Sequence, residues 1–342
     1  MRKFRCAVIG CGRIGCGFDD NSNDNIIRTH AGSYFKNHYT KLVALCDIDE
    51  SKLQKYGKKY GVSGLYTKSS EMLAKENIDC VSICTLVDTH LDLVREVSKY
   101  NIKGIFLEKP ISNSVQNAKK IIDICKKNRI TLIIDHQRRF DPFYNSVRQL
   151  IQKKRIGDIQ LINVYYGSGI SNTGSHMFDL LRFIFGEIRS VKANFSKNES
   201  INNLDPNIDA SLEFEDGTIC RVQALDYRSY SLFEMDILGS LGRIKLNLIS
   251  NEIEYFQVAT KNSLVYKNLI PLKIRIKKSK QSAIQLGVQN LVSSIRSGNE
   301  PKCTGKDGYL SLELIVASII SSKLGRRIHL PLSNNNYKIN SK

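Results

Sequence analysis

The chain has 342 residues, of which 42% are hydrophobic and 25% charged, an ordinary composition for a globular protein. This length suits two domains of about 100 to 200 residues each. No apolar run approaches the ~20 residues that a membrane-spanning helix requires. The basic N-terminus precedes too short an apolar segment for a secretory signal, so we expect a cytoplasmic protein with no membrane partner.

The net charge of +18 suggests a nucleic-acid partner, because basic surfaces neutralise phosphates. The lysines are spread along the whole chain, however, and no basic stripe is interleaved with aromatic residues. Two clusters stand out: Lys153 to Arg155, which we assign to a solvated helix end, and Lys273 to Lys278, whose alternation indicates an edge strand. We expect no nucleic-acid partner and rank a small anionic ligand above it.

Nine cysteines occur, and several lie in apolar runs where a reduced thiol behaves as a small hydrophobic group. No Cys-x-x-Cys pair suggests a zinc or redox centre. Cys11 and Cys16 stand near glycines, and we prefer packing to reactivity as their explanation. We expect no metal site.

The first predicted strand, Cys6 to Ile9, is a short apolar run typical of a parallel strand buried on both faces. It leads into Gly10-x-Gly12-x-x-Gly15. In a dinucleotide-binding turn the first glycine permits a tight turn, the second lets a pyrophosphate approach the backbone, and the third lets the following helix pack closely. Amides of the turn, which includes Arg13 and Ile14, hold the phosphates together with the positive helix end. The alternative is a glycine-rich turn without a ligand.

Phe18 to Asn25 is too polar for a helix core and lengthens the connection to the next strand, which indicates an inserted loop. Asp19, Asn21 and Asn23 have the alternating spacing of a calcium-binding loop, but the required glycine is missing and His30 replaces the required glutamate. We therefore reject calcium. Whether the insertion is a lid over the glycine turn or a surface loop stays open.

The second predicted strand, Leu42 to Cys46, ends in Asp47. An acidic residue at this strand end accepts hydrogen bonds from the adenosine ribose and repels a 2′-phosphate, which favours NAD over NADP. Asp49 is close enough to compete for this role, although it better suits the N-cap of a helix from Glu50 to Tyr60.

The elements that follow alternate: a strand at Cys80 to Cys84, a turn at Thr85 to His90, a helix at Leu91 to Tyr100 and a strand at Lys103 to Leu107. Strands that alternate with helices form parallel sheets with right-handed crossovers. Ligands of such sheets bind beyond the carboxyl ends of the strands. Asp47, Thr85 and Lys109 are predicted at that edge.

Glu108-Lys109-Pro110 ends the last of these strands. Together with the glycine motif, Asp47 and the Thr85 to His90 turn, it resembles the Gfo/Idh/MocA oxidoreductases, the glucose-fructose oxidoreductase and inositol dehydrogenase group. The similarity extends over nearly the whole chain, through Arg138 to Pro142, Ile156 to Ile159, Gly174 to Leu181 and Gly239 to Gly242. Two features depart from the family: Leu86 replaces its usual proline, and the insertion is longer than typical.

The resemblance implies a nicotinamide enzyme that oxidises a secondary alcohol of a sugar, cyclitol or nucleotide sugar. We place the Rossmann domain at residues 1–122 and the substrate-binding and oligomerisation domain at residues 123–342. The cofactor contacts implied for this chain are Gly10, Gly12, Arg13, Ile14, Asp47, Thr85, Leu86, His90, Glu108 and Lys109.

Hydride transfer from a carbinol needs a group that takes the hydroxyl proton and a cation that holds the developing oxyanion. Lys109 suits the second task and, if desolvated, could share the first. His176 suits the first task, because the positive end of a helix disfavours its charged form; without the resemblance, a structural histidine would be our default. The resemblance makes both residues catalytic candidates.

The family's usual aspartate four residues before this histidine is Asn172 here. An amide can bind a sugar hydroxyl but cannot carry a proton, so we assign Asn172 to substrate binding, with His176 and Arg139. Arg138, Arg139 and the Lys273 to Lys278 segment could attract a diphosphate, which favours a nucleotide sugar. Arg139 could equally pair with Asp141 or a backbone carbonyl, and a free sugar or inositol stays open.

From Asp158 the pattern changes to strands, predicted at Asp158 to Tyr166, Ile188 to Phe195, Ala210 to Phe214, Thr218 to Leu225, Leu232 to Leu238 and Arg243 to Leu248. Glu215 to Thr218 is a hairpin signal. Two late helices are predicted at Gln281 to Ser297 and Gly308 to Leu324. The fold class is thus α/β: an N-terminal Rossmann parallel sheet, then an α+β domain with an open, mainly antiparallel sheet. In the family the free face of that sheet forms dimers or tetramers, so we expect a homodimer or homotetramer.

Two other functions stay open. A redox-neutral hydrolase would retain its cofactor and use transient oxidation to cleave a glycosidic bond, without net NADH. A non-catalytic nucleotide-binding regulator would keep the fold alone, although the presence of both Lys109 and His176 argues against it.

Overall fold

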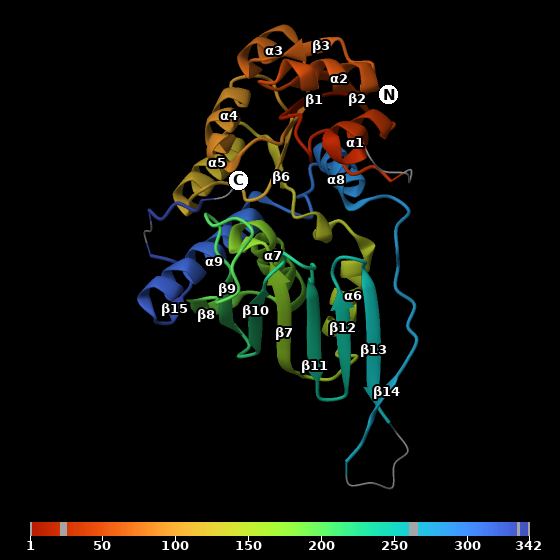
Figure 1. Ribbon diagram of the computed structural model, residues 1–342. Coiled ribbons are helices and arrows are strands. Elements are labelled where there is room, and N and C mark those ends of the chain that lie inside the picture. Colours follow the sequence, from red (N-terminus) through yellow and green to blue (C-terminus); the bar gives the residue numbers. More distant parts are fainter. Residues whose placement is uncertain (1, 21–25, 260–265, 334–335, 341–342) are drawn as a thin grey trace. The chain divides into compact units, whose positions relative to one another are not determined.

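The computed structural model describes residues 2–20, 26–259, 266–333 and 336–340, so Asn21 and Asn23 of the insertion lie outside the described part of the chain. Two compact units share the chain (Figure 1). The first consists mainly of Met1–Asp141 and Ser279–Leu310, and the second of Pro142–Lys278 and Ser311–Ser341. The division predicted between residues 122 and 123 stays a prediction.

Six parallel strands form the sheet of the first unit, in the order β3-β2-β1-β4-β5-β6. They are β1 (Phe4–Ile9), β2 (Thr40–Cys46), β3 (Gly64–Tyr66), β4 (Cys80–Ile83), β5 (Gly104–Leu107) and β6 (Thr131–Ile134). Every residue of β4 and β5 is buried, as continuous apolar runs in a parallel sheet predict. The expected Rossmann sheet is confirmed.

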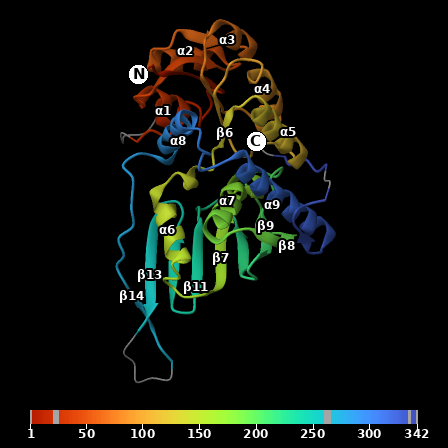
Figure 2. The ribbon, with the colours of Figure 1, turned by 180° about the vertical axis from the view of Figure 1, so that it is seen from behind.

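The helices of this unit are α1 (His30–Lys36), α2 (Glu50–Tyr60), α3 (Ser69–Lys75), α4 (His90–Val97), α5 (Val115–Lys127) and α8 (Ala283–Ser297). α8 comes late in the chain, yet it lies beside α1 (Figures 1 and 2). It also packs on β5, because a Cβ at Gly104 would lie 2.7 Å from Ile295. Within the described residues, no helix is long and apolar enough to cross a membrane.

The second unit contains a nine-stranded sheet in the order β14-β13-β12-β11-β7-β10-β9-β8-β15. Its strands are β7 (Ile159–Gly167), β8 (Ile188–Phe195), β9 (Ile208–Phe214), β10 (Ile219–Leu225), β11 (Glu234–Gly239), β12 (Gly242–Asn247), β13 (Glu252–Val258), β14 (Leu269–Pro271) and β15 (Ile328–His329). All pairs are antiparallel except β7 with β10. The expected mainly antiparallel sheet is confirmed.

Helices α6 (Pro142–Gln152) and α7 (Gly174–Phe185) lie on one face of this sheet (Figure 2). Most of α9 (Gly305–Leu324) belongs to the same unit, where Ser311 Oγ donates to the carbonyl of Ser175 at 2.9 Å. The predicted hairpin is present between β9 and β10, with Gly217 at φ +86°.

The edge strand predicted at Lys273 to Lys278 is wrong, because the edge strand is β14, and residues 272–279 form no strand. β14 pairs with β13 through only three residues and ends at Pro271. Phe256 lies opposite Pro271, and Leu272 N still donates to Tyr255 O at 2.8 Å, so one further backbone hydrogen bond follows the strand. Alternation alone predicted a strand at a segment that forms no ladder with β13, although β13 extends to Glu252.

Candidate active site

The glycine turn after β1 is shaped by backbone contact. Gly10 has φ +96°, and a Cβ there would lie 2.7 Å from the carbonyl carbon and oxygen of Cys84. A Cβ at Gly15 would lie 1.9 Å from the Gly10 oxygen, whereas a Cβ at Gly12 would meet nothing within 4 Å. Gly10 and Gly15 are therefore required by packing. Gly12 leaves open space beside the backbone, which is what a bound pyrophosphate needs.

The helix expected after Gly15 is interrupted. One helical turn forms, in which Cys16 N donates to Gly12 O at 3.0 Å, and α1 begins only at His30. Its first amides return to that turn: His30 N donates to Ile14 O at 3.2 Å and Ala31 N to Gly15 O at 3.0 Å. The insertion thus divides one helix, and backbone hydrogen bonds join its two parts.

The described part of the insertion is held at both sides. Asp19 accepts from Arg28 N at 2.6 Å and from the Thr29 hydroxyl, the N-cap of α1. Asp20 accepts from Lys55, Lys59 and Tyr56 of α2 at 2.7–2.8 Å. Desolvation would raise the pKa of Asp20, but these hydrogen bonds prevail and lower it to about 2. The insertion is therefore fastened to α2 by an ionised carboxylate.

Asp47 meets the glycine turn at the end of β2. One of its oxygens accepts from Cys11 N at 2.6 Å and the other from Asp49 N at 2.9 Å. Asp49 caps α2 through Ser51 N and Lys52 N, which confirms the N-cap prediction. Only Asp47 of the two aspartates thus touches the turn.

The turn after β4 carries Thr85, Leu86 and His90. Leu86 is 61% exposed, and its φ of −67° is the angle that proline fixes, so leucine keeps the backbone of the family's usual residue. His90 is buried between the carbonyls of Thr85 at 3.2 Å and Ile111 at 3.3 Å. Burial lowers the pKa of His90, so the ring is neutral and donates its one N–H to one of these two carbonyls.

Glu108, a predicted cofactor contact, is buried at the end of β5 with 8% of its surface exposed. Its Oε1 lies 3.1 Å from His30 Nε2, and its Oε2 accepts from Lys109 N at 3.3 Å. Asp135, directly after β6, places an oxygen 3.8 Å from the same His30 nitrogen. One nitrogen or oxygen atom from each of these three side chains lies within 4.8 Å of the other two, and all three residues are buried. Lys109 itself is half-buried at the end of β5.

The two carboxyl groups of this cluster carry different charges. Burial raises the pKa of Asp135 well above its usual range, and the neighbouring Glu108 raises it further. Burial also acts to raise the pKa of Glu108, but hydrogen bonding and charge from His30 outweigh it, so the net shift is downward. Like charges this close cannot both ionise at low cost. Glu108 is therefore the ionised member and Asp135 the protonated one.

In the second unit, a π-helical turn at Gly169–Thr173 precedes α7 and contains Asn172. Asp205, only 2% exposed, accepts from Ser171 N at 2.8 Å and from Asn172 N at 2.9 Å. His176 is half-buried in the first turn of α7, which ends at Gly186 as predicted. Position 172 carries an amide in place of the family's carboxylate. Asp205 supplies a carboxylate that holds the backbone of the same turn.

Arg139 lies in the first unit, where its guanidinium pairs with Asp307 at 3.0 Å and is 9% exposed. Asp307, an acid that sequence reasoning did not consider, is thus a partner of Arg139. The sequence-predicted residues Asp47, Thr85 and Lys109 follow strands β2, β4 and β5 of one parallel sheet, at its carboxyl edge as expected. Lys109 belongs to the first unit and His176 to the second.

Sequence reasoning missed His30, Asp135 and Asp205. Asp135 could have been found, because it follows an apolar strand as Asp47 does. His30 was considered only as a failed calcium ligand. Asp205 lies in a polar loop before β9, and no pattern in the sequence distinguishes it.

Replacing Asp205 with Ala should destabilise the second unit by about 2–6 kcal/mol, because two backbone amides lose their acceptor, at about 1–3 kcal/mol each. Urea unfolding measures this change. Asp216→Ala is the matched control: Asp216 also accepts from a backbone amide, Thr218 N, but in an exposed hairpin. Equal effects of the two substitutions would contradict the role of Asp205 as a buried acceptor that stabilises this turn.

Replacing Asp135 with Asn should raise the melting temperature at pH 7 by at least about 2 °C. A folded-state pKa above the unfolded value of 3.8 means that the acid keeps its proton only in the folded protein, so stability falls as pH rises above 3.8. An amide has no proton to lose. The gain should therefore vanish near pH 4 in thermal scans, and a gain that is independent of pH would contradict the protonated state of Asp135.

Known proteins align with nearly the whole chain. The D-apiose dehydrogenase of Paraburkholderia graminis is 23% identical, over 96% of this chain and 90% of its own length. The myo-inositol 2-dehydrogenase of Thermotoga maritima is 24% identical, over 96% of this chain and 98% of its own. The solved WlbA dehydrogenase from Bordetella pertussis, in complex with NADH and UDP-GlcNAcA, has a TM-score of 0.78 at 23% identity and covers 97% of this chain and 100% of that chain. The structural likeness shows a shared fold.

Two family matches cover most of the sequence. Residues 4–136 match GFO_IDH_MocA, described as an oxidoreductase family with an NAD-binding Rossmann fold. Residues 166–330 match the C-terminal alpha/beta domain of the same family. The chain therefore belongs to the GFO_IDH_MocA oxidoreductase family, and its first unit contains that family's NAD-binding Rossmann domain.

Proposed function

We propose that this protein is an NAD-dependent dehydrogenase that acts on a secondary hydroxyl group of a sugar or nucleotide sugar. The glycine turn carries the proposal, because Gly12 leaves open space beside the backbone and Asp47 lies against the same turn. The substrate class is supported by relatives named for D-apiose and myo-inositol and by the Bordetella structure that holds UDP-GlcNAcA.

NAD, when bound, supplies the hydride acceptor, and the chain supplies its binding and orientation. We propose that Asp47 accepts the ribose hydroxyls and excludes a 2′-phosphate, so that NAD is preferred to NADP. The exposed Leu86 would give a flat apolar contact in the turn after β4. The proposed cofactor contacts are Gly10, Gly12, Arg13, Ile14, Asp47, Thr85, Leu86, His90, Glu108 and Lys109.

We assign two chemical tasks to side chains. Lys109, as a cation at the carboxyl end of β5, would hold the negative charge that develops on the substrate oxygen. His176, in the first turn of α7, would take the hydroxyl proton, because the positive helix end favours the neutral, proton-accepting ring. Asn172 and Arg139 would bind substrate hydroxyl or phosphate groups.

We also propose a cytoplasmic homodimer or homotetramer that associates through the face of the nine-stranded sheet opposite α6 and α7. Half-exposed side chains cover this face, and some are already paired, such as Arg243 with Asp236 at 2.6 Å. Light scattering on the purified protein tests the assembly.

Replacing Gly12 with Ala should weaken NADH binding at least about tenfold while leaving thermal stability unchanged, because the added methyl group meets no protein atom. Fluorescence titration and thermal unfolding measure the two effects. Gly15→Ala is the contrasting variant and should lose stability, since its methyl group meets the Gly10 oxygen. Unchanged NADH affinity in Gly12→Ala would contradict the proposal that the cofactor pyrophosphate binds at this turn.

Replacing Lys109 with Ala should lower kcat by about a hundredfold or more while NADH still binds, because the transition state loses its cation. A screen of inositols, aldoses and UDP-sugars for NAD reduction first identifies the substrate. Lys103→Ala is the matched control: Lys103 precedes the same strand and pairs with Asp79 at 2.7 Å. Turnover that survives in Lys109→Ala would exclude this lysine from catalysis, and product without NADH would indicate the hydrolase instead.

A further inference from the structure

A buried polar network joins four segments of the first unit around His30. The residue is fully buried at the start of α1, with Nδ1 2.9 Å from Ser82 Oγ on β4 and Nε2 3.1 Å from Glu108 Oε1 after β5. The same nitrogen lies 3.8 Å from Asp135 Oδ2 after β6. The edge of the ring packs on Phe106, with centroids 4.6 Å apart. Both ring nitrogens are therefore engaged, and the ring cannot turn without breaking a contact.

The ionised carboxylate of the network, Glu108, lies next to Lys109 in the chain. Glu108 is ionised and Asp135 protonated, for the reasons given above. Glu108 precedes Lys109 in the chain, and the Lys109 charge lowers the pKa of both carboxyl groups, so it acts electrostatically on the network. By reciprocity, an ionised Glu108 favours the protonated form of Lys109.

Three other titratable groups near the network, Tyr34, Cys84 and His90, add no charge at neutral pH. Burial raises the pKa values of Tyr34, whose hydroxyl lies 2.9 Å from Ser82 Oγ, and of Cys84, so both stay protonated. Burial lowers the pKa of His90, which stays neutral. His136 follows Asp135 in the chain and is also buried. Glu108 is thus the ionised carboxylate that this network presents to Lys109.

We propose that His30 is a positioning residue, which keeps the buried carboxylate of Glu108 ionised and in place and thereby keeps Lys109 protonated. This role rests on the proposed dehydrogenase function, in which Lys109 acts as a cation. Without a donor at the His30 Nε2 position, a buried carboxylate takes up a proton, and Lys109 loses its negative neighbour. His30 also donates its backbone N–H to Ile14 O, so the network is continuous with the glycine turn.

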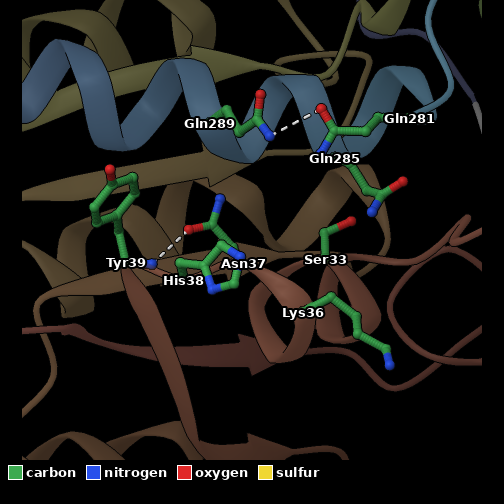
Figure 3. Close-up of a pocket in the computed structure, with 8 residues that line it drawn as sticks. All are labelled: Ser33, Lys36, Asn37, His38, Tyr39, Gln281, Gln285 and Gln289. Carbon is green, nitrogen blue, oxygen red and sulfur yellow. Dashed lines mark hydrogen bonds between the residues drawn. The ribbon is translucent and has the colours of Figure 1, made fainter.

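The test compares two amides at position 30. In His30→Gln the amide nitrogen takes the place of Nε2 and can still donate to Glu108, whereas in His30→Asn it takes the place of Nδ1 and cannot. His38→Asn is the control for loss of a histidine, because His38 lies near the other end of α1, in a surface pocket of about 170 Å³ with Gln281, Gln285 and Gln289 (Figure 3). Thermal unfolding first shows that each variant is folded.

The readout is the apparent pKa of Lys109, measured by competitive acetylation with isotopically labelled acetic anhydride and mass spectrometry across pH. His30→Asn should lower it by about one unit or more, as Glu108→Gln should, because a lysine without a nearby negative charge loses its proton at lower pH. His30→Gln and His38→Asn should titrate like the wild type. The alkaline limb of the pH profile of kcat/KM should move to lower pH in His30→Asn and Glu108→Gln. It should stay in place in His30→Gln and His38→Asn.

An unchanged Lys109 pKa in His30→Asn overturns the proposal. So does the finding that the purified protein binds a stoichiometric metal ion which His30→Gln does not bind. The acetylation needs no substrate, so the role of His30 and the proposed dehydrogenase function are tested separately. Turnover that survives Lys109→Ala would remove the catalytic role of Lys109 and leave the acetylation result standing. A normal Lys109 pKa in His30→Asn would remove the role of His30 and leave the dehydrogenase standing.

Discussion

Close backbone contact at the glycine turn is the constraint on which the first unit depends. The chain passes so near to itself that a Cβ at Gly10 would meet the Cys84 carbonyl and one at Gly15 would meet Gly10. Backbone hydrogen bonds extend the contact, from Gly10 N to Cys46 O and from Cys84 N to Ile9 O. The ends of β1, β2 and β4 are thereby brought to one edge. Asp47, the open side of Gly12 and the turn at Thr85 are neighbours for that reason.

Local patterns in the sequence were enough to predict this edge. A run of buried apolar residues followed by a required glycine, or by an acid, specifies where a strand ends, and Asp47 was found in this way. Lys109 was placed at the same edge by its strand but singled out by the resemblance of Glu108-Lys109-Pro110 to the family. The cap at Asp49 and the stop at Gly186 are equally local, because each depends on the backbone within one helical turn. In the second unit, alternation predicted the strands from β7 to β12. The same signal misled at Lys273 to Lys278, since alternation does not decide whether a segment pairs with the strand beside it.

Contacts between distant segments could not be predicted from such patterns. The insertion was recognised from its polarity, but not that α1 would hydrogen-bond back to Ile14 and Gly15 across it. α8 joins the first unit from far along the chain, and only the packing of its side chains on β5 shows where it belongs. The His30 contact with Glu108 spans 78 positions in the sequence. Periodicity carries no information on partners that far apart.

The buried network holds four segments together at a cost in folding free energy. Burying ionisable groups costs free energy that their mutual attraction only partly repays, and apolar side chains of similar volume often stabilise a fold equally well. Asp135 illustrates the cost, because folding must keep it protonated at a pH where the unfolded chain would ionise it. An apolar cluster could hold α1 against the sheet, but it could not place a negative charge immediately before Lys109. The sign and position of that charge are what distinguish a network that serves a cationic lysine from one that only supports the fold.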